Sequence, residues 1–180
     1  MANGLTSPLG YAQPMEQIFH SSKCPEKVFA FWMNPNEESE NGGELTLCGI
    51  DHSHYTVTFS TGELAWIPVI SSNAWQVPID AVNIGDQVIG TQMEGLFDTG
   101  SALIVVPSAQ YYQIVAAVGA QYDGERFWTY CMYVDWQLPL TFTFNGKQYD
   151  IPASAYWLTV RNGYLIIHHI EIQCDMLDRP

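Results

Sequence analysis

The residues best suited to chemistry lie in one short stretch, Asp98-Thr99-Gly100-Ser101, between two apolar segments. A tight turn would project the carboxylate of Asp98 toward a water molecule, the arrangement that proton transfer by a side chain requires. Gly100 has no side chain, so its backbone can approach the carboxylate and donate an N–H group. The hydroxyl of Thr99 can fix the turn, and that of Ser101 can orient the outer carboxylate oxygen. The alternative is an ordinary aspartate in a turn at the end of a strand.

Apolar segments on both sides predict the elements that hold this turn. Residues 96–97 enter it as the end of a strand, and the run 103–106 predicts a second strand. Pro107 then opens a helix with Ser108 as the predicted N-cap, and Gly119 ends it. We assign the apolar face of the helix to the core rather than to a cofactor site; its residues are Tyr111, Ile114, Val115 and Val118.

The first part of the chain predicts a short helix and a hairpin. Met15, Ile18 and Phe19 follow Pro14 at the spacing of one helix face. Residues 28–33 predict a buried strand, 34–43 a polar turn, and 44–47 the start of the returning strand.

Further strands are predicted at 64–70 and at 75–77, the second ended by Pro78. A domain boundary is expected near the loop between these two segments. Later in the chain, apolar residues alternate with threonines before Asn145-Gly146, which is a strong hairpin signal.

Taken together, these segments resemble the pepsin and cathepsin D family of aspartic endopeptidases, over roughly residues 25 to 160. The stretch 95–106 resembles the second of that family's two active-site motifs. Further matches in family order are 49–51 with Tyr55, 64–69, 75–77, 138–139, 142–146 and 155–156.

The resemblance implies a mainly β, pepsin-like acid protease fold, with a short helix after the Asp-Thr-Gly turn. Residues 1–70 would be a remnant of the N-terminal lobe, and 71–180 the C-terminal lobe that carries the motif. The implied activity is hydrolysis of peptide or protein substrates at acid pH, with no metal or cofactor. In that family, for which pepsin is the reference case, two aspartates about 3 Å apart share one proton and activate a water molecule. Asp98 would be one of them.

The sequence departs from the family because Asp98 lies in its single Asp-Thr/Ser-Gly motif. The family's first motif and its flap tyrosine lie in an N-terminal portion that this chain is expected to lack. Residues 165–170 also lack the glycine of the family's C-terminal apolar-apolar-Gly-Asp segment. We therefore expect the isolated chain to be inactive without a companion lobe or a second copy of itself. The alternative is a non-catalytic pepsin-fold binding protein or an inactive truncated fragment.

The cysteines are Cys24, Cys48, Cys131 and Cys174. They show no CxxC spacing, so a zinc cluster is unsupported, and disulfides or buried thiols both remain open. The family resemblance implies a bridge between Cys131 and Cys174.

Two pairs of histidines are weak candidates for a metal site. His52-Ser53-His54 is interpreted as a polar turn, because no third ligand is identifiable. His168 and His169 would point to opposite faces of a strand, which argues against joint ligation.

Composition limits the classes of binding partner and the cellular compartment that we expect for this chain. Six Lys and Arg against 19 Asp and Glu give a formal net charge of −13, which disfavours nucleic acid and anionic membranes as partners. Few bases mean little self-repulsion in acid, although acidity that serves solubility alone explains the charge equally well. Neither a signal peptide in residues 1–10 nor a membrane span is predicted. The family resemblance implies a secreted or lysosomal/vacuolar protein.

Overall fold

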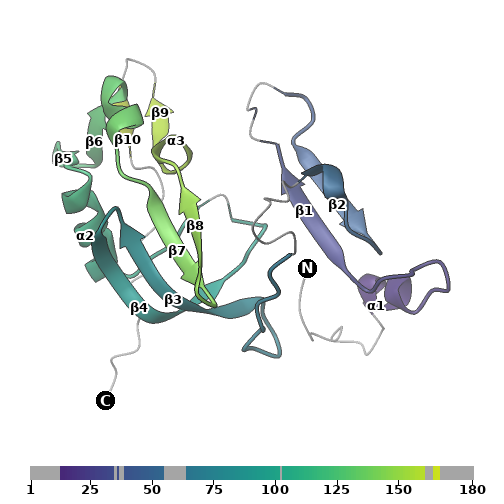
Figure 1. The fold of residues 1–180 in the computed structure, drawn as a ribbon. Helices are drawn as coiled ribbons and strands as arrows, with labels where there is room; N and C mark the ends of the chain where they lie inside the picture. Colours follow the sequence, from purple (N-terminus) through teal and green to yellow (C-terminus); the bar gives the residue numbers. More distant parts are fainter. Residues whose placement is uncertain are drawn as a thin grey trace. The chain divides into compact units, whose positions relative to one another are not determined.

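The computed structural model describes residues 13–34, 36, 39–54, 64–101, 103–160 and 164–166, with backbone alone for 158–160 and 164–166. This part of the chain is mainly β, as predicted, with antiparallel sheets and short helices (Figure 1). It divides into two units, Gly4–Trp66 and Ile67–Pro180. The division falls close to the predicted boundary at residue 70, and the assignment of the units to two protease lobes stays a prediction.

The Gly4–Trp66 unit is built around one hairpin. Its elements are α1 (Pro14–Phe19), β1 (Phe29–Met33), β2 (Gly43–Leu47) and the 3-10 helix η1 (His52–His54). The predicted helix and hairpin are confirmed, and β1 pairs with β2 in antiparallel register from Phe29↔Leu47 to Met33↔Gly43. The prediction of a buried strand is wrong: Phe31 and Met33 are 39% and 58% exposed. Among the described residues, no third strand joins this two-stranded ribbon to cover its apolar face.

A disulfide closes this hairpin. Cys24 lies ahead of β1 and Cys48 directly after β2, and the two are bridged. Cross-linking residues 24 apart in sequence removes conformational entropy from the unfolded chain, because the segment between them can no longer extend freely. The bridge therefore stabilises a ribbon that has little buried apolar surface of its own.

Replacing both bridged cysteines, as Cys24→Ser with Cys48→Ser, is expected to destabilise the hairpin by about 3 kcal/mol, the loop-entropy cost for a ring of this size. Hydrogen exchange of the β1 and β2 amides measures this directly, and exchange should be faster by about two orders of magnitude at that cost. Cys131→Ser, which changes a cysteine of the other unit, is the control and should leave these amides unchanged. Equal protection in the double variant and the natural chain would refute the expectation.

In the Ile67–Pro180 unit, the main sheet has the strand order β4-β3-β7-β8. Its strands are β3 (Gln76–Ile84), β4 (Gln87–Leu96), β7 (Leu140–Phe144) and β8 (Lys147–Ile151). The hairpin predicted at Asn145-Gly146 is confirmed: β7 pairs with β8, and the two turn residues have φ of 48° and 74°. Pro78 does not end its strand as predicted. Strand β3 pairs with β7 only from Ala81 onward. One side of β3 therefore needs no N–H donor at Pro78, so a proline can occupy that position within the strand.

The described residues of this unit also form a second sheet and three helical segments. The sheet has the order β5-β6-β10-β9, and its strands are β5 (Gln121–Tyr122), β6 (Phe127–Tyr130), β9 (Leu158–Val160) and β10 (Tyr164–Ile166). The helical segments are α2 (Ser108–Ala117), the 3-10 helix η2 (Cys131–Trp136) and α3 (Ala153–Tyr156). Among the described residues, no helix has the length and apolar composition needed to cross a membrane.

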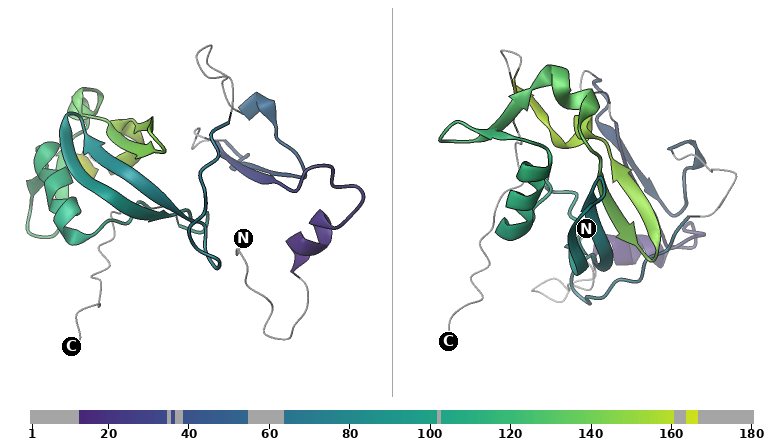
Figure 2. Two further views of the ribbon diagram at one scale, coloured as in Figure 1. Left: turned by 60° about the horizontal axis from the view of Figure 1, so that its bottom comes forward. Right: turned by 60° about the vertical axis from the view of Figure 1, so that its left-hand side comes forward.

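Helix α2 packs beside β4 and forms one wall of the core (the teal helix in Figure 2). The apolar face predicted from its periodicity is buried as expected. The N-cap is Pro107, one residue earlier than predicted, since Pro107 has extended backbone angles and Ser108 is already helical. Gly119 has a φ of 65°, and the Ala120 N–H donates to the Val115 carbonyl at 2.9 Å, so the helix ends with a left-handed glycine.

Two predicted strands are absent from the described part of the chain. Residues 64–70 and 103–106 have no strand pairing there. In the second segment Ile104 and Val106 pack against the core while Val105 is 48% exposed. The alternating burial of this segment thus comes from packing against the core and not from strand pairing in the described part of the chain. The most buried side chains of the core are Ile84, Ile114 and Leu140.

Candidate functional site

The Asp98 turn follows directly from the β3–β4 hairpin. Leu96, the last residue of β4, is the register partner of Gln76, the first residue of β3. The Phe97 N–H then donates to the Trp75 carbonyl at 2.9 Å. The Phe97 ring centroid lies 5.9 Å from that of Phe144 on β7. The chain that enters the turn is therefore held by backbone and ring contacts up to the residue before Asp98.

Within the turn, backbone groups hold the Asp98 carboxyl. The Gly100 N–H donates to Asp98 Oδ1 at 2.9 Å, and the Ser101 N–H donates to the Asp98 carbonyl at 3.2 Å. A Cβ at Gly100 would lie 3.2 Å from the same Oδ1, tighter than an ordinary contact. The glycine thus permits the close approach that the sequence predicts. With Oδ1 held, Oδ2 is the carboxylate oxygen left to meet water.

Among the described residues, the hydroxyl groups of Thr99 and Ser101 do not show the contacts that the sequence predicts for them. Ser101 Oγ lies 3.3 Å from both the backbone N and the carbonyl O of Leu103, so it bridges the next backbone segment. Thr99 is exposed. Orientation of the carboxylate by Ser101 and fixation of the turn by Thr99 stay predictions.

The surface around the turn is open and partly apolar. Asp98 through Ser101 are all exposed, and the two residues ahead of them, Leu96 and Phe97, are 62% and 58% exposed. Large apolar side chains exposed together are characteristic of surfaces that another protein element covers. The Asp98 carboxylate on this surface is accessible to water, and its role in proton transfer stays a prediction.

The predicted bridge between Cys131 and Cys174 stays a prediction. Within the described part of the chain Cys131 has a free thiol and is half-buried against the core. Cys174 lies outside the described residues, as do His168 and His169.

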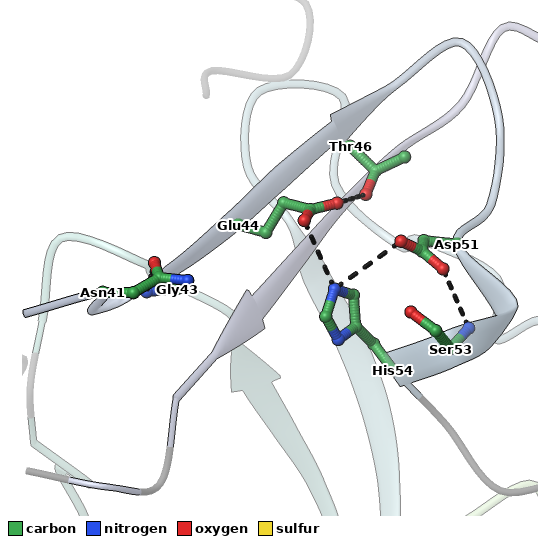
Figure 3. A network of polar contacts seen from close by, with 7 residues as sticks. All are labelled: Asn41, Gly43, Glu44, Thr46, Asp51, Ser53 and His54. Atoms are coloured by element: carbon green, nitrogen blue, oxygen red, sulfur yellow. Dashed lines mark hydrogen bonds and ion pairs between the residues drawn. The ribbon is translucent and has the colours of Figure 1, made fainter. Parts of the chain in front are cut away.

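Sequence reasoning missed a second cluster of polar side chains, shown in Figure 3. His52–His54 form a turn, as interpreted, but Glu44 and Asp51 join His54, and the ligand atoms of these three residues lie within 4.8 Å of one another. Hydrogen bonds from the side chain and backbone of Ser53, with a smaller contribution from the charge of His54, lower the pKa of Asp51. The signal that would have revealed the cluster is the pairing of Trp32 with Glu44 in the hairpin, because the His54 ring stacks on Trp32 beside Glu44.

Comparison with known proteins supports the resemblance. Residues 5–169 match the family model described as eukaryotic aspartyl protease. Pepsin B of Canis lupus familiaris is 32% identical over 154 residues, covering 83% of this chain and 38% of the relative. Gastricsin of Mus musculus is 35% identical over 159 residues, covering 85% and 38%. Cathepsin E of Oryctolagus cuniculus is 35% identical over 138 residues, covering 73% and 32%.

The chain thus spans about two fifths or less of the length of these relatives. Its pepsin-like character, predicted from the ordered motifs, is confirmed. The chain belongs to the eukaryotic aspartyl protease family.

Proposed function

We propose that this chain supplies Asp98 as one of the two catalytic aspartates of a pepsin-like endopeptidase that cleaves peptide bonds in acid. The observation that carries the proposal is the Asp98 turn itself. In a chain of this family, a strand end delivers Asp98, and the Gly100 N–H holds its Oδ1 at 2.9 Å. Thr99, Gly100 and Ser101 support the carboxylate. The second aspartate would come from a further Asp-Thr/Ser-Gly segment, on the same polypeptide or on a companion chain.

The chemistry follows from two facing carboxylates that share one proton. The ionised carboxylate takes a proton from water as the water oxygen attacks the carbonyl carbon of the peptide, and the protonated one gives its proton to the carbonyl oxygen. The tetrahedral intermediate then collapses, the C–N bond breaks, and a proton passes to the leaving amine. Because one carboxyl group must be protonated and the other ionised, the reaction belongs at acid pH.

Charge and cysteine usage agree with this setting. In acid most of the 19 Asp and Glu lose their charge, and only six Lys and Arg with five His remain to repel one another. The Cys24–Cys48 disulfide suits an oxidising compartment, such as the secretory route or a lysosome. Peptides or unfolded proteins are therefore the proposed substrates, in a secreted or lysosomal setting.

A specific observation also favours a second candidate function, that of a non-catalytic binding protein. Leu96 and Phe97 expose apolar side chains directly ahead of the Asp98 turn. Such a surface suits the docking of a companion lobe, of a second copy, or of an unfolded peptide that is held and not cut.

An acid hydrolysis assay separates the two functions. The paired form is the chain joined to, or mixed with, a lobe that carries a second Asp-Thr/Ser-Gly motif. We expect the paired form to cleave a denatured protein in acid, and the monomeric chain to show no activity, since it has only one motif aspartate. An assembled pair that binds denatured protein without cutting it would establish the binding function instead. Hydrolysis by a species shown to be monomeric would contradict the need for a second aspartate.

A further inference from the structure

Three side chains of the β1–β2 unit converge on one point. His54 Nε2 lies 3.4 Å from Glu44 Oε2 and 3.6 Å from Asp51 Oδ2 (Figure 3). Four ligands at the bond lengths typical of Zn²⁺ are about 3.3 Å apart in a tetrahedral shell. The two measured separations are close to that value. They are longer than the 2.7–3.2 Å of a direct N–H···O hydrogen bond.

Each carboxylate is held by one oxygen and presents the other. Glu44 Oε1 accepts a hydrogen bond from the Thr46 hydroxyl at 3.0 Å, and Asp51 Oδ1 accepts one from the Ser53 N–H at 2.8 Å. Oε2 of Glu44 and Oδ2 of Asp51 are the oxygens that face His54. Metal ligands are commonly oriented by outer hydrogen bonds of this kind.

The imidazole is fixed as well. Its ring stacks on Trp32 with centroids 4.2 Å apart and planes 14° from parallel. The Nε2 atom is buried and makes no hydrogen bond within the described part of the chain. A buried ring nitrogen without a hydrogen-bond partner is unusual, and an ion between it and the two carboxylates would satisfy it.

We propose that Glu44, Asp51 and His54 bind one Zn²⁺, with a water molecule as the fourth ligand. One imidazole nitrogen with two carboxylate oxygens is a donor set that Zn²⁺ accepts. A cavity of about 300 Å³ is lined in part by Asp51 and His54 and has room for that water molecule. The ion would tie β2 to the η1 turn. Every ligand lies in the Gly4–Trp66 unit, whereas Asp98 belongs to the Ile67–Pro180 unit.

Calorimetric titration of the full, oxidised chain with ZnCl₂ tests the proposal. We expect one ion per chain in the natural protein. Glu44→Gln and His54→Gln each remove a ligand and should weaken binding by about 100-fold or more, beyond the 10–100-fold that loss of an outer contact costs. Thr46→Val keeps all three ligands and removes only the hydroxyl that holds Glu44, so it should weaken binding by about tenfold. His52→Gln is the matched control and should bind as the natural chain does.

The competing account is a protonated His54 paired with both carboxylates and no metal. Under it, the natural chain would bind Zn²⁺ no more tightly than His54→Gln does, and that result would overturn the proposal. Equal weakening in His52→Gln and His54→Gln would indicate an adventitious surface site and would also overturn it. Co²⁺ gives an independent reading, because a tetrahedral site produces intense visible absorption and an octahedral one does not. If a ligand variant fails to fold, Thr46→Val decides: unchanged affinity there refutes the proposed geometry.

Discussion

The variant Asp98→Asn is expected to lower kcat/KM of the paired form by at least about 1000-fold, within the range that general acid–base groups contribute. Asparagine has the same shape and keeps an oxygen that can accept the Gly100 N–H, so the turn should persist. What it loses is the ability to take up and release a proton. The loss should therefore appear in kcat, with KM for a peptide substrate changed little.

The control for this prediction is Asp86→Asn, which makes the same chemical change at an exposed turn between β3 and β4. It should retain the activity of the natural paired form across the acid range. Retention of activity within about tenfold by Asp98→Asn would mean that another carboxylate performs the proton transfer, since a tenfold loss corresponds to only about 1.4 kcal/mol of transition-state stabilisation.

The variant Ile84→Ala is expected to reduce the free energy of unfolding of the Ile67–Pro180 unit by about 3 kcal/mol, as typical for truncation of a fully buried isoleucine. Ile84 is 0% exposed at the end of β3, where its register partner Leu140 is 1% exposed. The substitution removes apolar contacts and leaves a cavity that the paired strands cannot close by moving.

Ile70→Ala is the matched control, because it removes the same atoms in the same unit from a side chain that is 49% exposed. Urea unfolding followed by tryptophan fluorescence measures both variants, and the control should lose less than about 1 kcal/mol. Similar losses in the two variants would show that Ile84 is not at the centre of the core.

Local patterns in the sequence predicted those elements whose signals lie within a few residues. The helix face that includes Ile114 follows from a 3.6-residue period, and the β7–β8 hairpin follows from Asn145-Gly146, because both signals are short-range. The N-cap was misplaced by one residue, since Pro107 also adopts the extended angles that this position requires. Residues 103–106 show the limit of such reasoning: their apolar character predicts burial but does not say whether a partner strand exists.

Features that depend on long-range pairing were missed for a physical reason. Cys24 and Cys48 meet because the β1–β2 register brings the two ends of the hairpin together, and spacing alone does not reveal a register. Glu44 meets His54 because the His54 ring stacks on Trp32, the register partner of Glu44. The Asp98 turn was the opposite case, since Asp98 and Gly100 interact across two residues and the motif itself contains both partners.

The Cys24–Cys48 bridge also makes residues 24–48 a covalent ring. A peptidase that cuts once inside the ring opens it without releasing either piece, because the sulfur link still holds the two ends. Such a cut would be invisible on a gel run without reductant and would appear as two fragments once the bridge is reduced. A protein with such a ring can in this way have one break in its backbone and still remain one molecule.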